Sequence, residues 1–140
     1  SAYAEVTGEY HEAHPHETVP AYFCGDISHA YVDSARSVVH DHWELFELEL
    51  PRMAEFHFKN TDELYRSTFG FGAAERERGI IDLAELREIL LRRADDVPVE
   101  DLTGYLELGG PKLGRDYSDP LLRDELVESI EAIREVFPEV

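Results

Sequence analysis

Apolar and polar positions alternate in two parts of the segment 1–60, partly over residues 1–10 and more regularly over 46–58. Over residues 1–10 this alternation predicts a short strand. The same period over 46–58, divided by Pro51, predicts a β-hairpin. Between these segments, apolar residues recur every three or four positions over 28–43, which predicts a helix. That helical spacing also continues as far as Leu50, so a longer helix that ends before Pro51 is the alternative to the hairpin.

The segment 61–140 shows the three-to-four-residue spacing of amphipathic helices. Capping-box sequences begin at Asn60 and Asp82, and Asp119 followed by Pro120 is a further helix start. The segment 109–118 is rich in Gly, Pro and Asp, which is the composition of a loop. Helices are therefore predicted over 60–69, 82–94, 98–108 and 120–137.

These elements predict an α+β fold for a single globular domain that spans residues 1–140. Short N-terminal strands and a hairpin would pack against three to five helices, and the C-terminal half would be all helical. An all-α fold is the main alternative, because the region of the predicted hairpin also fits a helix. A chain of 140 residues can bury a core without disulfides, and its one cysteine, Cys24, has no partner within the chain.

The chain is strongly acidic, with 31 Asp and Glu against 13 Lys and Arg and a formal net charge of −18. Such a surface repels nucleic acid, whose binding depends on Lys and Arg, and it repels anionic membranes. It attracts a basic protein partner by electrostatic steering. Adaptation to solubility or to high salt produces the same acidity, so both explanations stay open. Because the chain has no apolar run of transmembrane length and no secretory signal, we expect a cytoplasmic protein.

All seven histidines lie between positions 11 and 57, and four of them form His-x-His pairs. On an extended backbone such a pair can chelate a divalent metal, and a nearby carboxylate can complete the ligand set. The candidate metal ligands are His40, His42, His57 and Glu44. Low-false-positive spacings such as His-Glu-x-x-His do not occur in the sequence. On a helix, His40 and His42 would point about 200° apart, so ordinary surface histidines are the competing interpretation.

The sequence carries no motif for nucleophilic catalysis. No Gly-x-Ser-x-Gly element occurs, and a single thiol such as that of Cys24 is more often a small core residue than a nucleophile. The glycine-rich segment 109–115 lacks the Gly-Lys-Ser/Thr ending of a phosphate loop, so we predict a plain loop. Aromatic residues are plentiful within 1–60, where they would form either a core or the lining of a small-molecule pocket.

An acidic stretch with aromatic neighbours is the remaining candidate for a function. In an inhibitor of a basic protein, carboxylates steer the partner and aromatic residues supply the main contacts. The predicted partner-binding residues are Asp41, Trp43, Glu44, Glu47, Glu49 and Glu55. We therefore predict an acidic binding or inhibitor protein without a cofactor, of the immunity-protein or nucleic-acid-mimic type, rather than an enzyme. The alternative is a small metal-binding protein or enzyme with a His/Glu site, a divalent metal and an aromatic-lined pocket within the segment 1–60.

Overall fold

The computed structural model describes residues 2–109 and 118–138 of the chain. Its helices are α1 (Ala2–Ala13), α2 (His42–Glu49), α3 (Ala73–Arg78), α4 (Leu83–Arg92) and α5 (Pro120–Val136). Its strands are β1 (Phe23–Asp26), β2 (Tyr31–Val32), β3 (Val38–His40), β4 (Met53–Phe58) and β5 (Thr103–Leu106). The structure confirms the predicted α+β class, and the last part of the chain is helical as predicted. No helix within these ranges is both long and apolar enough to cross a membrane.

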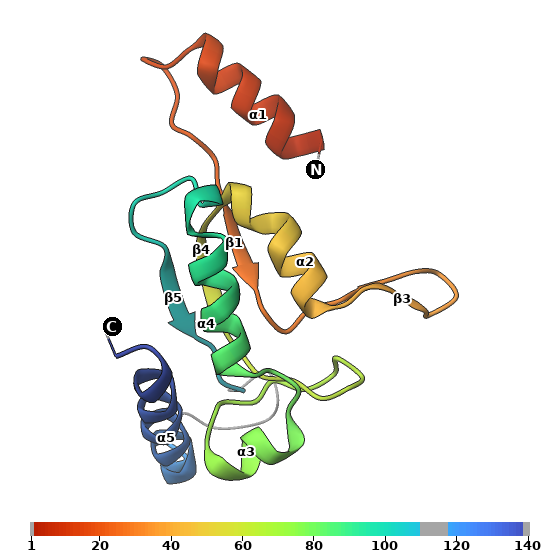
Figure 1. The fold of residues 1–140 in the computed structure, drawn as a ribbon, viewed down its shortest axis with the longest axis vertical. Coiled ribbons are helices and arrows are strands. Elements are labelled where there is room, and N and C mark those ends of the chain that lie inside the picture. Colours follow the sequence, from red (N-terminus) through yellow and green to blue (C-terminus); the bar gives the residue numbers. More distant parts are fainter. Residues whose placement is uncertain (1, 110–117, 139–140) are drawn as a thin grey trace.

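The central element is a parallel sheet with the strand order β1-β4-β5, and β2 and β3 form a separate antiparallel pair (Figure 1). The register places two rows of residues side by side across the sheet: Cys24, Glu55 and Thr103, then Asp26, His57 and Tyr105. Parallel strands need a crossover connection, and here α2 precedes β4 in the chain while α3 and α4 precede β5. All three strands therefore end at the same edge of the sheet.

One face of the sheet, which we call the covered face, packs against helices and forms the hydrophobic core. Side chains alternate between the two faces of a strand, so Phe56 and Phe58 point to this face, and both are buried. The Phe56 ring meets Phe46 of α2 edge-on, with ring centroids 5.7 Å apart. Leu86 of α4 and Ile133 of α5 belong to the same buried cluster. Figure 1 shows α4 passing in front of β4.

The opposite face, which we call the open face, carries Glu55 and His57 of the central strand. Glu55 and its neighbour Cys24 are exposed, and His57 is partly exposed. Tyr105 on β5 is 50% exposed. The exposure of these side chains shows that the described helices do not cover this face, in contrast to the buried phenylalanine side chains on the covered face.

The structure confirms the helices predicted over 82–94 and 120–137 as α4 and α5. The sequence signals for both lie within the helix or at its first residues. Asp82 caps α4, and its carboxylate accepts hydrogen bonds from the backbone N–H groups of Ala84 and Glu85. Asp119 caps α5 in the same way, with Pro120 at the first helical position. Capping residues and apolar spacing therefore agree with the structure in both helices.

Two predictions for the N-terminal region are wrong. Of the predicted strand over residues 1–10, residues 2–10 are described, and they belong to the helix α1. Ala and Glu in this segment are good helix formers, and they outweigh the short alternation. The predicted helix over 28–43 is not present: the strands β2 and β3 pair across a turn instead, and only His42 and Trp43 are helical, as the first residues of α2. The Asp33 carboxylate accepts a hydrogen bond from the Ser37 N–H in that turn, and β-branched and aromatic residues flank it, as strands prefer.

The predicted hairpin over 46–58 is also wrong, and the helical alternative is right for its first part. The helix α2 ends at Glu49, before Pro51, and only β4 is a strand. The start of α2 is fixed by a capping box, in which Asp41 accepts from the Glu44 N–H at 2.9 Å and Glu44 accepts from the Asp41 N–H. The alternation that begins at residue 46 therefore lies on a helix.

The predicted helices over 60–69 and 98–108 are wrong, and α3 was not predicted. The buried amide oxygen of Asn60 accepts hydrogen bonds from the N–H groups of Thr61 and Ile81, so Asn60 joins two chain segments instead of capping a helix. In the segment 98–108, the leucines have the spacing of a helix. Backbone pairing with β4 nevertheless makes β5 a strand. The predicted loop over 109–118 lies almost wholly outside the described residues.

Candidate metal centre

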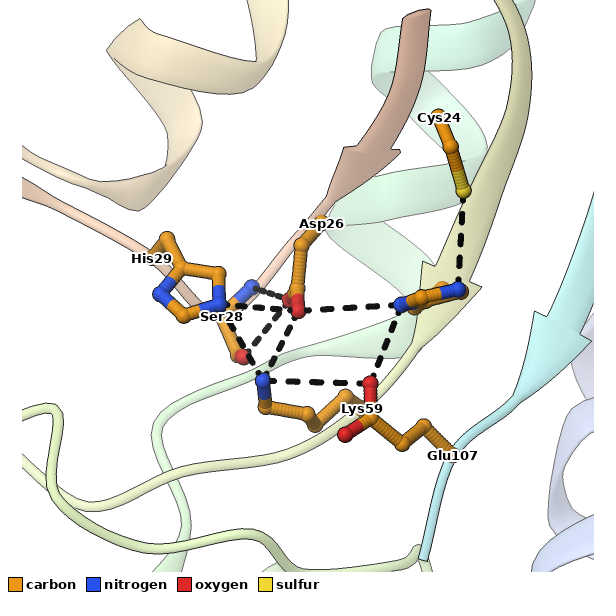
Figure 2. Close-up of polar contacts among 7 residues, drawn as sticks. Cys24, Asp26, Ser28, His29, Lys59 and Glu107 are labelled. Atoms are coloured by element: carbon orange, nitrogen blue, oxygen red, sulfur yellow. Dashed lines mark hydrogen bonds and ion pairs between the residues drawn. The ribbon is translucent and has the colours of Figure 1, made fainter.

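Polar side chains gather where the three parallel strands end (Figure 2). Asp26 is the last residue of β1, His57 lies near the end of β4, and Glu107 directly follows β5. Lys59 comes just after β4. In open sheets with parallel strands, ligands bind outside the carboxyl ends of the strands. This edge is therefore the place where the fold itself predicts a functional site.

Asp26, His57 and Glu107 could hold one metal ion together. One ligand atom from each of them lies within 4.8 Å of the others. His57 Nδ1 lies 3.0 Å from Glu107 Oε2 and 4.0 Å from Asp26 Oδ2. An imidazole nitrogen with two carboxylate oxygens is a ligand set for ions such as Zn²⁺, Mn²⁺ or Fe²⁺. Among the described residues, this is the one group of three or more such side chains with that convergence.

The two oxygens of the Asp26 carboxylate have different partners. Its Oδ1 accepts hydrogen bonds from the Ser28 backbone N–H at 2.8 Å and from the Ser28 hydroxyl at 2.7 Å. Its Oδ2 lies 2.8 Å from Lys59 Nζ and 3.0 Å from His29 Nε2. Burial raises the pKa of Asp26, but the hydrogen bonds from His29, Lys59 and Ser28 outweigh it and lower the pKa well below its usual range. Asp26 is therefore an anion at neutral pH.

Cys24 supports the ring of His57 from the side opposite the cluster. Its Sγ lies 3.5 Å from His57 Nε2. When Nδ1 binds a metal, the ring proton must be on Nε2, where it can be donated to the sulfur. Burial raises the pKa of the Cys24 thiol, and the nearby Glu55 and Asp26 raise it further. The sulfur is thus a neutral hydrogen-bond partner at neutral pH, and a thiolate nucleophile is not favoured.

The structure brings one of the predicted metal ligands, His57, into this cluster and places the others elsewhere. His40 Nδ1 pairs with Glu44 Oε2 at 3.5 Å near the start of α2. His42 stacks at an angle on Trp43, and its Nδ1 lies 3.3 Å from the Tyr65 hydroxyl. Among the described residues, His40, His42 and Glu44 do not converge with His57 on one point.

The predicted partner-binding residues on α2 already have contacts within the chain. Glu47 binds Arg92 at 2.7 Å and Arg93 at 2.8 Å through its two carboxylate oxygens. Trp43 packs against the hydrophobic core. Glu49 is partly buried, and burial raises the pKa of its carboxyl group. Glu47 and Trp43 therefore have structural contacts within the chain, and Glu49 is only partly accessible to a partner.

The other three predicted partner-binding residues differ in their surroundings. Asp41 and Glu44 form the capping box of α2. Glu55 is exposed on the open face, next to Cys24 in the register of the sheet. The predicted acidic stretch is therefore divided between the helix α2 and the open face of the sheet.

An aromatic-lined cavity exists, but Asp26, His57 and Glu107 are not among the residues that line it. It has a volume of about 450 Å³, and its lining includes Phe56, Phe58, Leu90, Leu102 and Phe137. The two phenylalanines of β4 point to the covered face. The cavity is thus a partly open, mainly apolar pocket on the covered side of the sheet. It contains none of the three converging side chains Asp26, His57 and Glu107, so we assign the candidate site to the polar edge.

Sequence reasoning missed Asp26, Glu107, Lys59 and His29 as site residues. In the sequence, Asp26 has the character of a helix cap, and Glu107 falls inside a predicted helix. A useful signal is present, because the short apolar run at 21–24 and the alternating segment at 53–58 are each followed by polar residues. Recognising it requires the assignment of parallel strands, which local periodicity does not provide.

Comparison with known protein families, with curated proteins and with solved structures finds no match for this chain. The assignment of the site therefore rests on its geometry and chemistry.

Proposed function

We propose that this protein is a metal-dependent enzyme that binds one divalent cation through Asp26, His57 and Glu107. The observation that carries the proposal is the convergence of these three side chains, from three parallel strands, within 4.8 Å. Residues distant in sequence are brought together at the edge where parallel sheets bind ligands. Two carboxylates balance the double charge of the ion, so the site is suited to a cation.

Three protein ligands also favour a catalytic centre over a structural one. Structural sites of a tetrahedral ion usually have four protein ligands, whereas catalytic sites leave a position for water or substrate. An ion held here would polarise an oxygen of a small polar substrate as a Lewis acid. The exposed His29, hydrogen-bonded to Asp26, lies where it can take up or release a proton during such a reaction. Both the metal and the proton carrier would therefore be reached from solvent.

Metal titration of chelator-treated protein tests the ligand set. We expect one Mn²⁺ or Co²⁺ per chain by isothermal titration calorimetry. Asp26→Asn and His57→Ala should each weaken binding by more than the roughly 10–100-fold typical of an outer-shell change. His40→Ala is the matched control, because it removes a partly exposed histidine that the sequence also predicted as a metal ligand. Unchanged affinity in His57→Ala, or loss of binding in His40→Ala instead, would contradict the proposed site.

Solvent relaxation tests whether the centre is open. A bound Mn²⁺ ion that keeps an exchangeable water raises the longitudinal relaxation rate of bulk water protons. We expect this enhancement in the Mn²⁺-loaded protein and its loss in His57→Ala at the same metal concentration. A bound ion without the enhancement would indicate a closed, structural site and would exclude the catalytic role.

The acidic surface supports a second candidate function, the binding of a basic protein. The supporting observation is the net charge of −18 together with the exposed carboxylate of Glu55. A polyarginine peptide is a suitable probe, since steering predicts fast association at low salt and slower association at high salt. Glu55→Gln should slow association, whereas Glu47→Gln should change it less, because Glu47 already binds two arginines. Association that does not depend on salt would remove this candidate.

A further inference from the structure

Lys59 is a buried cation that lies directly beside the candidate metal ligands Asp26 and Glu107 (Figure 2). Its side chain is 9% exposed. Its Nζ lies 2.8 Å from Asp26 Oδ2, 3.2 Å from His29 Nε2 and 4.0 Å from Glu107 Oε2. A lysine is rarely buried to this extent unless nearby groups compensate its charge. Here the compensation comes from the same two carboxylates that would bind the metal.

The charges at the site show what a ligand must bring. With a divalent ion bound, Asp26 and Glu107 balance the charge of the ion. The ammonium group of Lys59 adds a positive charge directly beside the ion, and the carboxylate of Glu49, which interacts electrostatically with Asp26 and His29, offsets it only from a greater distance. An anionic ligand oxygen is attracted by both the ion and the ammonium group, whereas a neutral ligand lacks this attraction.

The hydrogen bonds of Lys59 leave room for such an oxygen. An ammonium group has three N–H donors, and Asp26 accepts one of them. His29 Nε2 can accept a second one only when the ring proton of His29 is on Nδ1, and Glu107 at 4.0 Å is beyond hydrogen-bond distance. Within the described residues, at least one donor of Lys59 is thus available to a bound ligand.

We propose that Lys59 binds the anionic oxygen of a small chelating oxyanion whose other oxygen binds the metal. The substrate class is a compact carboxylate with an adjacent oxygen, as in a 2-oxo or 2-hydroxy acid. This inference rests on the proposed metal centre and assigns it a substrate class. Two charge-assisted contacts, one to the ion and one to Lys59, set both affinity and orientation.

Oxalate is the probe for this inference, since it is a small chelating oxyanion, and its neutral diamide oxamide is the comparison ligand. Both are titrated into the Mn²⁺-loaded protein by calorimetry, with the electron paramagnetic resonance signal of Mn²⁺ as a second readout. The wild type should bind oxalate and discriminate strongly against oxamide. Lys59→Met should bind oxalate about 10–100-fold more weakly, the loss expected for a hydrogen bond to a charged group. Lys59→Arg should retain part of the affinity.

Two controls separate this role from a structural one. Arg52→Met removes an equal charge at the start of β4, at the opposite end of the strand from Lys59, and should leave oxalate affinity unchanged. Mn²⁺ affinity should not fall in Lys59→Met, because the ammonium group competes with the ion for Asp26 Oδ2. Loss of Mn²⁺ affinity there, or oxalate affinity equal to that of the wild type, overturns the role of Lys59. Absence of Mn²⁺ binding by the wild type overturns the proposed metal centre and this inference with it. If Lys59→Met does not fold by circular dichroism, Lys59→Gln and Lys59→Arg provide the same comparison.

Discussion

The two faces of the parallel sheet have opposite chemistry, although a single strand contributes to both. On the covered face, Phe56 and Phe58 are 3% and 7% exposed, and they pack against each other with ring centroids 4.7 Å apart. On the open face, the side chain of His57 is 37% exposed and Glu55 is exposed. One face therefore holds the fold together by removing apolar area from water. The other face displays groups that can bind ions.

The comparison shows how a polar site can stay ordered without burial in a core. The backbone of β4 is fixed by its phenylalanine side chains on one face, which in turn fixes the position of His57 on the other. Neighbouring polar groups then orient the individual atoms, as Ser28 does for Asp26 and Cys24 for His57. Stability and chemistry should accordingly respond to different substitutions.

The largest expected effect is on the covered face. Phe56→Ala removes a buried ring that contacts Phe46 and Phe58, and it should lower the free energy of unfolding by about 3–5 kcal/mol. Denaturant unfolding followed by circular dichroism measures this loss. Phe56→Leu retains most of the volume and should cost clearly less. A cost below about 1 kcal/mol for Phe56→Ala would show that the helices do not form a tightly packed core against the sheet.

The elements that sequence patterns predicted well are those whose signals lie within the element itself. The helices α4 and α5 have capping aspartates and a single apolar stripe, so local and tertiary preferences agree. The pattern of α2 is misleading because Leu48, an apolar residue that suggests an inward position, is 64% exposed. Its alternation with glutamates imitates a strand, whereas the start of the helix is set by the capping box at Asp41.

The site was less accessible to sequence reasoning than the helices. His57 stands out in the sequence as a possible ligand because histidines and carboxylates are common metal ligands. Its two partners, Asp26 and Glu107, are distant in sequence and come together only through the pairing of three short parallel strands. Strand pairing between distant segments depends on tertiary contacts rather than on local propensity, and β5 in particular has the apolar spacing of a helix.

A smaller effect is expected on the open face, and it should appear in metal affinity rather than in stability. Cys24→Ala removes the sulfur that lies 3.5 Å from His57 Nε2. The ring then loses a partner that favours the tautomer with Nδ1 available, so Mn²⁺ affinity should fall by roughly 10-fold. Cys24→Ser keeps a hydrogen-bond acceptor and should lose less. Calorimetric titration of the three proteins measures the difference, and equal affinities would mean that the thiol does not orient His57.

The pH dependence of stability tests the role of His42, the first residue of α2. Burial lowers the pKa of His42 below its usual 6.5, while Asp41 and Glu85 partly oppose this effect. The unfolded state therefore binds a proton more readily than the folded state, and the free energy of unfolding should decrease as the pH falls below about 6.5. The His42 Nδ1 also lies 3.3 Å from the Tyr65 hydroxyl, and the Nε2 of the ring is buried without a hydrogen-bond partner among the described residues.

The variant His42→Gln isolates this contribution, because the other histidines are present in both proteins. Between neutral and mildly acidic pH, the unfolding free energy of the wild type should decrease more than that of His42→Gln. Denaturant titrations over this range measure it. A difference that does not change with pH would show that His42 is protonated equally in the folded and unfolded states.

The smallest expected effect comes from the residue next to Phe56 on the same strand. Glu55 is exposed on the open face, and its side chain does not belong to the hydrophobic core. Glu55→Gln should therefore change the free energy of unfolding by no more than about 0.5 kcal/mol. Denaturant unfolding in parallel with Phe56→Ala provides the comparison between adjacent positions. A loss close to that of Phe56→Ala would mean that both faces stabilise the fold, and the division of stability and chemistry between them would be wrong.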